Sequence, residues 1–413
     1  MERGIREEDL EIIKSVSEAK LQILEKYISA WSSILGTKND QLVYIDAFAG
    51  SGLYRKMGRL NEIIEGSPLR VLRIVAGTLH DMIKKETIKH TIKIRLFFVE
   101  KNKRKAITLK RRLEELFSSL NIYSDVGKNI TFEVYSEDSK TFVGDIIKNI
   151  PPTVPTFLFI DPYGYPFPLP MINHFMTRRK TEVLLNLMWF RINIDMGSED
   201  KTANRELLTR MFGHNLWETE RFVGKHGKQR EEDFIKYVLQ QFVARYKLAY
   251  KVGYGPEDKI KGKDKRTKYY LIHLTNHPKG AVEMKRIIKE IGDFRGKGEF
   301  SSKRDMFYDK MPDDKEFVKS LKDRLVRNYI KYSFYKGLTF MQLLAETADW
   351  KHKDAWLYEN KHYRNALRDL ENDGRVLIIT HDGRERKRKG IEDQDIIVFL
   401  PPKAAKKKKD HGR

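Results

Sequence analysis

Two glycines close an apolar run near the start of the chain, in the stretch Tyr44-Ile45-Asp46-Ala47-Phe48-Ala49-Gly50-Ser51-Gly52-Leu53. This pattern is typical of a buried parallel strand that turns into a tight loop beside a nucleotide. Glycine suits such a loop because a Cβ would block close approach of the backbone and forbid positive φ. The dinucleotide fingerprint would need a third glycine at position 55, where Arg55 stands. An ordinary strand and turn is the alternative.

Three acidic residues stand at or just past the ends of later predicted strands: Glu100, Asp138 and Asp161. Carboxyl ends of parallel strands share one edge of a sheet, so these side chains are expected near the glycine loop. Glu100 is suited to accept hydrogen bonds from two ribose hydroxyls, and Asp138 from an adenine amino group. The alternatives are an ion pair with a neighbouring lysine for Glu100 and a helix cap for Asp138. Asp46 either positions a ligand ammonium group or ties down the loop.

The glycine loop resembles the DxFxGxG loop of class I S-adenosylmethionine (SAM) methyltransferases. We therefore predict SAM as the cofactor. The residues expected to bind it come from the loop and the acidic strand ends: Asp46, Phe48, Gly50, Ser51, Gly52, Glu100 and Asp138.

The stretch Asp161-Pro162-Tyr163-Gly164 is the second motif that carries chemistry. An acid and a backbone carbonyl here would accept hydrogen bonds from an exocyclic amine, and an aromatic ring would stack on an extruded base. Proline stiffens the loop and so helps to place the acceptors in advance. Asp161, Pro162 and Tyr163 are therefore the predicted catalytic residues. The stretch resembles the DPFG-x-P loop of tRNA guanine-N2 methyltransferases; a rigid strand-to-helix turn is the alternative.

Strands and helices alternate around these motifs. After helices within residues 8–34, strands are predicted at 42–48, 94–100, 130–135, 156–160 and 182–189, with a helix after each of the first four. This alternation predicts a doubly wound parallel sheet of the Rossmann-like class I methyltransferase type, with helices on both faces. Two further strands, 248–255 and 268–275, are expected to close the sheet as an antiparallel pair.

The last part of the chain has a different pattern. We divide the chain into a methyltransferase-like domain (1–295), a connecting helical segment (296–330), a winged helix-turn-helix domain (331–402) and a basic disordered tail (403–413). Nucleic-acid contacts are expected on the second helix of the winged domain and at the tip of its hairpin. They are Lys361, Arg364, Arg368, Arg384, Arg386, Lys387 and Arg388. The alternatives are a winged helix that contacts protein and, for the helix residues, a merely solvated face.

Composition limits the class of function. The 413 residues carry a formal net charge of +22 and contain no cysteine. The charge favours a phosphate-rich partner, RNA or DNA. The absence of cysteine excludes disulfides, thiolate nucleophiles and cysteine-bound clusters within this chain. The scattered histidines predict no metal site, and the sequence has neither a signal-peptide pattern nor a membrane-spanning run, which predicts a cytoplasmic protein.

Several motifs together resemble the three-Cys-motif partner protein family, over roughly residues 19–291. They are Ala19–Leu24 through Trp31, the loop Tyr44–Tyr54, Gly66–Leu69, Phe159–Gly164, His273–Asn276 and Gly280–Lys285. The resemblance implies a methyltransferase-like fold. It also implies a partner with three clustered cysteines, similar to radical-SAM proteins, that would carry an iron–sulfur cluster. The resemblance does not imply a particular substrate.

Three functions follow from these features. The first is a SAM-dependent methyltransferase that acts on an exocyclic base amine of RNA or DNA, working with the three-cysteine partner. The second is a catalytically degenerate SAM-fold protein that holds nucleic acid and recruits that partner. The third is methylation of a small molecule, with the basic surface incidental.

Overall fold

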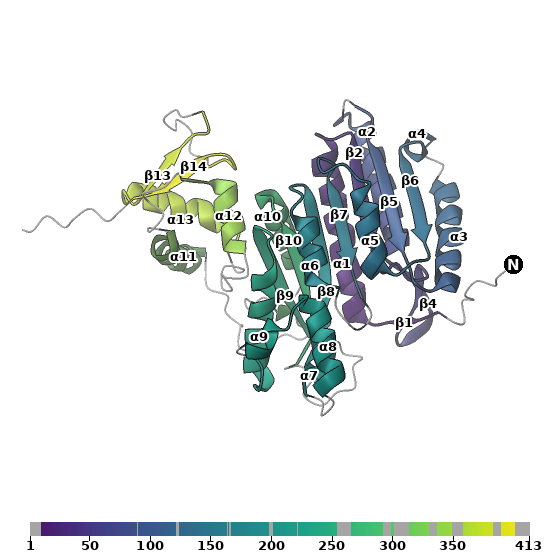
Figure 1. Cartoon of the computed structure of the whole chain (residues 1–413). Coiled ribbons are helices and arrows are strands. Elements are labelled where there is room, and N and C mark those ends of the chain that lie inside the picture. The colour runs from purple at the N-terminus through teal and green to yellow at the C-terminus, as the bar shows by residue number, and fades with distance from the viewer. Residues whose placement is uncertain are drawn as a thin grey trace, which may run out of the picture. The chain divides into compact units, whose positions relative to one another are not determined.

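The structure is a computed structural model, and it describes residues 10–88, 90–120, 124–162, 164, 167–197, 201–220, 222–253, 266–291, 299–300, 314–329, 337–348, 358–382 and 390–400. The chain divides into two compact units, Met1–Arg304 and Asp305–Arg413. The tail at 403–413 lies outside the described residues. Figure 1 shows the elements of both units.

An eight-stranded sheet forms the centre of the first unit (Figure 1). Its strands, in spatial order, are β11 (Glu299–Phe300), β9 (Tyr246–Gly253), β10 (Thr267–Thr275), β8 (Thr181–Leu187), β7 (Thr156–Ile160), β2 (Gln41–Asp46), β5 (Lys93–Val99) and β6 (Ile130–Tyr135). The five strands from β8 to β6 are parallel, and β10 runs antiparallel to both β8 and β9. Every residue of β7 and β8 is buried, as expected for central strands with both faces covered. The predicted parallel sheet with an antiparallel closing pair is confirmed.

Helices cover both faces of this sheet. Right-handed crossovers place α2 (Ser67–Lys84) and α3 (Lys103–Ser119) on one face and α5 (Ser139–Lys148) and α6 (Leu169–Met176) on the other (Figure 1). The first of these layers continues through α1 (Ser15–Gly36), which packs against α2 and α10 (Pro278–Ile291). The remaining helices of the unit are α4 (Ser124–Gly127), α7 (Trp189–Gly197), α8 (Lys201–Phe212), η3 (Leu216–Thr219) and α9 (Gly227–Gln241).

A small second sheet follows the glycine loop, where the sequence did not predict strands. β3 (Leu53–Lys56) and β4 (Arg59–Glu65) form a hairpin, and β1 (Ile12–Ile13) pairs with β3 in parallel. Tyr54 packs against a cluster of Ile13, Leu21 and Ile64. The hairpin is therefore attached to the start of α1 by apolar contacts.

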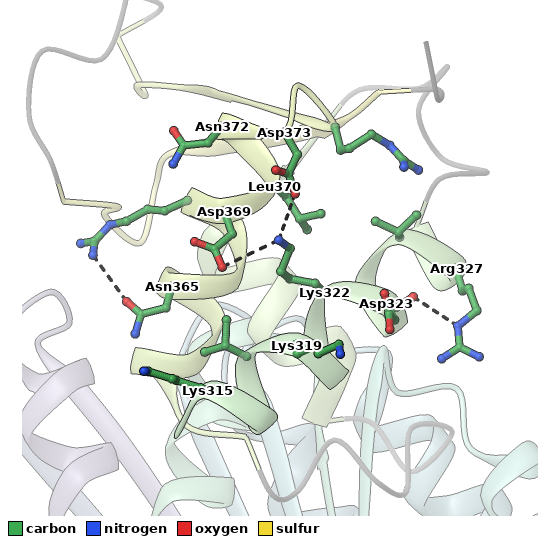
Figure 2. A pocket seen from close by; sticks show the side chains of 14 residues that line it. Lys315, Lys319, Lys322, Asp323, Arg327, Asn365, Asp369, Leu370, Asn372 and Asp373 are labelled. Carbon is green, nitrogen blue, oxygen red and sulfur yellow. Dashed lines mark hydrogen bonds and ion pairs between the residues drawn. The ribbon is translucent and has the colours of Figure 1, made fainter. Parts of the chain in front are cut away.

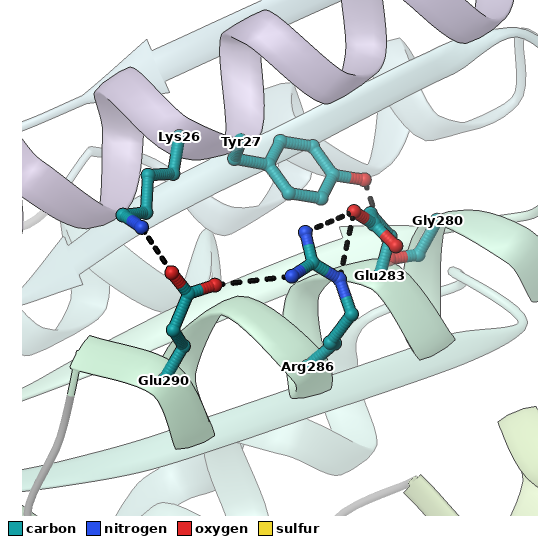
Figure 3. Close-up of polar contacts among 6 residues, drawn as sticks. All are labelled: Lys26, Tyr27, Gly280, Glu283, Arg286 and Glu290. Atoms are coloured by element: carbon teal, nitrogen blue, oxygen red, sulfur yellow. Dashed lines mark hydrogen bonds and ion pairs between the residues drawn. The ribbon is translucent and has the colours of Figure 1, made fainter. Parts of the chain in front are cut away.

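Polar contacts hold α1 to the sheet and to α10, and Figure 3 shows those that involve α10. The Tyr27 hydroxyl donates to Glu182 Oε2 in the buried interior and lies 3.3 Å from the carbonyl oxygen of Gly280. His273 Nε2 lies 3.1 Å from the same Glu182 oxygen. Burial, with the charge of Glu182, raises the pKa of Tyr27, which keeps its hydroxyl a donor. These contacts fix the position of α1, which also supplies a residue of the site described below.

Nearer the surface, Lys26 of α1 forms an ion pair with Glu290 of α10. Arg286 contacts Glu290 at 3.0 Å and Glu283 at 2.6 Å within α10 (Figure 3). This chain of charges runs along the contact between the two helices. It is partly exposed, so its contribution to stability is small beside that of the buried contacts.

The described residues of the second unit form three helices and a three-stranded sheet. The helices are α11 (Asp314–Tyr329), α12 (Phe340–Ala348) and α13 (Asn360–Asn372), and the strands are β12 (Leu338–Thr339), β13 (Val376–Ile379) and β14 (Ile396–Phe399). The sheet order is β12-β14-β13, with antiparallel pairing throughout. α11, which the sequence assigned to a connecting segment, packs against α13 in this unit.

Candidate functional site

The direction of the chain through the sheet reverses between β2 and β7. From β2 the chain moves outward to β5 and β6, then returns to the other side of β2 to form β7 and β8. In an open α/β sheet, ligands bind at such a reversal, outside the carboxyl ends of the strands. The glycine loop follows β2 and the Asp161 motif follows β7. The two motifs singled out in the sequence thus meet at the position that the fold favours for a ligand.

The glycine loop has the backbone conformation that its residues predict. Gly50 and Gly52 have φ values of +64° and +89°, a region that side chains with a Cβ rarely adopt. A Cβ on Gly52 would lie 2.9 Å from Leu109 Cδ1, and one on Gly66 would lie 2.8 Å from Tyr54 Cε2. The loop therefore depends on glycine for conformation and for space.

Backbone hydrogen bonds hold the loop between its two neighbouring strands. The Ala47 amide donates to Phe159 O of β7 at 2.9 Å, and the Ala49 amide to Val99 O of β5 at 3.0 Å. The buried Ser51 presents its carbonyl to Arg112 Nη1 of α3, which donates at 2.8 Å. The loop is consequently fixed from both sides and from the helix layer.

Glu100 supports the same loop. Its Oε2 accepts from the Gly50 amide at 3.0 Å, and its Oε1 accepts from the Asn102 amide at 2.7 Å. A carboxylate has about four acceptor positions, so two backbone donors leave room for two hydroxyl donors. Within the described part of the chain no lysine forms an ion pair with Glu100, which was the alternative considered for it.

Asp46 is fully buried at the end of β2. Its Oδ1 accepts from the Phe48 amide at 3.1 Å, so the side chain does tie down the loop. Burial raises the pKa of Asp46 to about 7, while the Ser67 hydroxyl and the Phe48 amide oppose this shift. The charges of Asp161 and Glu100 raise that pKa further, which shows that the acidic strand ends interact electrically. Ser67 is the first residue of α2, and Gly66 is the N-cap of that helix.

Asp138 caps α5, the alternative considered for it. Its Oδ1 accepts from the Lys140 amide at 3.0 Å, and its Oδ2 pairs with Lys101 Nζ at 2.8 Å. The hydrogen bond from Lys101 is the main reason that the pKa of Asp138 is lowered. Both oxygens already have partners, so an adenine amino group would have to share one of them.

Asp161 is held by two side chains, and the sequence analysis did not assign one of them, Lys20, to this site. Lys20 of α1 forms an ion pair with its Oδ2, and Asn186 Nδ2 of β8 donates to its Oδ1 at 2.6 Å. Lys20 is only 6% exposed, and its ammonium group also lies 5.7 Å from the ring centre of Tyr269. Asn186 Oδ1 is buried and has no hydrogen-bond partner among the described residues. The site therefore contains a neutralised carboxylate beside a free amide acceptor.

Aromatic residues connect the two loops. Phe48 contacts Phe167 edge to face, with ring centres 6.4 Å apart. Burial and, to a smaller extent, the charges of Asp161 and Asp46 raise the pKa of Tyr54. Pro162 is buried and Gly164 has a φ of +106°. The predicted stacking residue Tyr163 lies outside the described residues.

The residues predicted to bind nucleic acid are in different situations. Arg364 is turned to its own unit: its Nε donates to Ile391 O at 3.1 Å, and its guanidinium lies 4.9 Å from the ring centre of Phe340. Lys361 is exposed on α13, 4.0 Å from Glu359, and Arg368 contacts Asn365 at 3.5 Å. The predicted hairpin-tip residues are outside the described part of the chain: Arg384, Arg386, Lys387 and Arg388.

The described residues show neither a metal-binding cluster nor a membrane-spanning helix. No group of three or more histidine, aspartate or glutamate side chains there is arranged to hold a metal ion. Within the same residues, no helix has the length and apolar character needed to cross a bilayer.

No protein-family model matches the sequence, and no curated protein matches it. Solved structures with some likeness include the plantazolicin methyltransferase BamL, with a desmethyl-plantazolicin analogue and SAH, at 10% identity and a TM-score of 0.26 over 63% of this chain and 86% of that one. Trm1 from Pyrococcus horikoshii with S-adenosyl-L-methionine has 10% identity and a TM-score of 0.30 over 93% and 91%. A putative class I SAM-dependent methyltransferase from Listeria monocytogenes has 11% identity and a TM-score of 0.26 over 63% and 60%. With TM-scores below 0.5, none of them defines the reaction of this chain, which has to be argued from its own residues.

Proposed function

We propose that this protein is a SAM-dependent methyltransferase of class I type that acts on an exocyclic amine of a nucleic-acid base. The observation that carries the proposal is the meeting of the glycine loop and Asp161 at the chain reversal between β2 and β7. An antiparallel pair that closes a parallel sheet, here β10 with β9, is also the normal ending of a methyltransferase core.

The residues at this edge of the sheet fit SAM. The positive φ values at Gly50 and Gly52 keep side chains away from the loop, so a ligand can approach its backbone closely. Glu100 retains acceptor positions for the two ribose hydroxyls. Asp46, once ionised, would attract the ammonium group of the methionine part. Phe48 and Ser51 complete this part of the site, and Asp138 is the proposed adenine contact.

When bound, SAM would supply an electrophilic methyl group on its sulfonium. The protein's own part would be to hold the acceptor nitrogen in position. An exocyclic amine has two N–H donors, and Asp161 Oδ1 and the unpartnered Asn186 Oδ1 are two acceptors at adjacent strand ends. Pro162 and Gly164 fix the loop that carries Asp161, and Tyr163 is the proposed stacking residue.

A positioning role of this kind does not require a strong base. Two hydrogen bonds from the amine would turn its lone pair toward the methyl group, and the surplus proton could leave after transfer. Because geometry supplies much of the rate in such a step, small displacements of the acceptors are costly.

We assign nucleic-acid binding to the second unit, as a winged helix. Three helices with a β12-β14-β13 sheet, and a hairpin after the last helix, match that arrangement. α13 would be the helix that contacts nucleic acid. The three-cysteine partner implied by the family resemblance remains a prediction.

The test is transfer of label from methyl-labelled SAM to mixed RNA and DNA. The wild-type protein should label one of the two. Asp161→Asn should still bind SAM but lose transfer by roughly 100-fold or more, because a carboxylate acceptor becomes a mixed donor and acceptor. Glu115→Gln, at an exposed site on α3, is the matched control and should transfer normally.

A catalytically inactive SAM-fold adaptor is the second candidate, and the Lys20 ion pair favours it. That pair neutralises the carboxylate that an amine methyltransferase would use. The adaptor predicts SAM binding without labelled nucleic acid. Full transfer by Asp161→Asn would contradict the proposed role of Asp161.

A further inference from the structure

A groove of about 1350 Å³ lies between α11 and α13 in the second unit (Figure 2). Six basic side chains line it, against three aspartates. The basic residues are Lys315, Lys319, Lys322, Arg327, Arg368 and Arg375. At neutral pH the lining therefore carries a net positive charge.

One wall of the groove is a row of lysines on α11. Lys315, Lys319 and Lys322 have the spacing i, i+4, i+7, which puts them on one face of the helix over about 10 Å of its length. Lys315 and Lys319 are exposed, and neither has an ion-pair or hydrogen-bond partner in the part of the chain that the structure describes. Figure 2 shows both beside the groove.

Lys322 has a different role from the other two lysines. Its Nζ lies 2.9 Å from Asp373 and 3.8 Å from Asp369, so it ties α11 to α13 across the groove (Figure 2). This pairing uses two of the three aspartates. The positive charge that remains comes mainly from Lys315 and Lys319 on one side of the groove. On the other side it comes from Arg368 of α13 and from Arg375.

The far wall adds donors of other kinds. Arg368 and the amides of Asn365 and Asn372 belong to α13, and Arg375 follows that helix. Arg375 Nε is buried without a hydrogen-bond partner among the described residues. Arginine, lysine and asparagine are side chains that contact phosphate oxygens in nucleic-acid complexes. Among the described residues that line the groove none is aromatic, whereas a protein-binding groove usually has an aromatic anchor.

We propose that this groove binds the phosphate backbone of nucleic acid. The inference rests on the proposed function for its choice of partner, and it adds α11 to the contact surface. In this proposal Lys315 and Lys319 contact nucleic acid, and Arg364 does not, because its side chain is engaged within the unit.

The experiment measures binding of a labelled random-sequence RNA and of the matching DNA duplex to the full chain at several salt concentrations. The double variant Lys315→Glu/Lys319→Glu is compared with Lys110→Glu/Lys128→Glu. The control changes the same charge at two exposed lysines of the first unit. Thermal unfolding of each variant checks that both units remain folded.

The groove variant should bind at least about tenfold more weakly at 0.1 M salt. Loss of two phosphate contacts should also lower the slope of log K against log salt by about 1.8 for the duplex. The control should keep the wild-type slope. Equal affinity and slope in the two variants would overturn the proposal. The proposal would also be overturned if polyglutamate displaced labelled nucleic acid from the wild type as readily as unlabelled nucleic acid does. That result would favour an acidic protein as the partner.

A SAM titration of the same variants separates this proposal from the proposed function. Unchanged SAM binding with weakened nucleic-acid binding supports the groove. Nucleic-acid binding through the groove by a protein that does not bind SAM would sustain the groove and reject the methyltransferase. SAM binding with no effect of the groove substitutions would reject the groove alone.

Discussion

Lys20 changes the chemistry that can be expected of Asp161. The carboxylate does not stand alone at the end of β7, because a nearly buried ammonium group pairs with it and Asn186 donates to it. A charged pair removed from water stays in place only where its partners compensate the lost hydration. Lys20 therefore acts as a positioning residue that fixes the direction of Asp161.

Removing one member of this pair should be costlier than removing both. Lys20→Met is expected to destabilise the protein by about 2–3 kcal/mol, because it leaves a largely buried carboxylate without a cation. Adding Asp161→Asn should recover much of that loss, with a coupling of about 1–3 kcal/mol in urea unfolding. The exposed pair of Lys26 and Glu290 is the control. A double-mutant cycle on that pair should show a far weaker coupling energy. Additive effects of Lys20→Met and Asp161→Asn would contradict the pairing.

Asp46 predicts a pH dependence of stability. Its pKa is raised from 3.8 to about 7 by burial, so the folded protein binds a proton there that the unfolded chain has released. The stabilising contribution is present below pH 4 and is lost as the pH rises toward 7. Between pH 5 and pH 8 the wild type should lose about 2–3 kcal/mol relative to Asp46→Asn, which has no titrating group.

Urea unfolding of the wild type and Asp46→Asn at several pH values measures this difference. Other groups titrate in both proteins and cancel in the comparison. A constant difference between pH 5 and pH 8 would mean that Asp46 is ionised throughout, and that burial does not control its charge.

At the scale of elements, the glycine loop depends on what surrounds it. β2 leads into it, α3 holds its carbonyl through Arg112, and the β3–β4 hairpin places Tyr54 against Gly66. Leu109 of α3 and Tyr54 of β3 occupy the space that a Cβ on Gly52 or on Gly66 would need, so the conformation of the loop depends on these elements.

Gly52→Ala should therefore destabilise the first unit by about 1–3 kcal/mol, from the positive φ and the contact with Leu109. Gly77→Ala is the matched control. Gly77 lies within α2, and a Cβ there would have no atom within 4 Å. That substitution should stabilise the helix by about 0.5–1 kcal/mol. Equal effects of the two substitutions in thermal unfolding would contradict the account of the loop.

The sequence predicted the central elements well and their long-range contacts poorly. β7 has the predicted bounds because a continuous apolar run between turn residues specifies a buried strand. β6 also has its predicted bounds, although it is an edge strand with a single buried residue. The β3–β4 hairpin was missed because the mostly polar segment 53–65 has no clear alternation. Lys20 and Asp161 are 141 residues apart, so no local pattern could pair them. A signal did exist: Lys20 falls on the apolar stripe of α1, at the spacing of Leu24, Tyr27 and Trp31.

At the scale of the whole molecule, the net charge of +22 is a reason to propose a polyanionic partner. Part of that positive charge lies in the basic groove of the second unit. The first unit contributes the acidic edge at the chain reversal. A basic groove in one unit and carboxylates at a sheet edge of the other agree with the proposal that one unit holds a polyanion and the other binds SAM.

The most direct test of the central claim is a calorimetric titration of the full chain with SAM, repeated with Gly52→Ala and Gly77→Ala. The account predicts heat of binding to one site per chain in the wild type and in Gly77→Ala, and strongly reduced heat in folded Gly52→Ala. No heat and no thermal stabilisation at about millimolar SAM, a concentration that should saturate even a site of weak affinity, would contradict it.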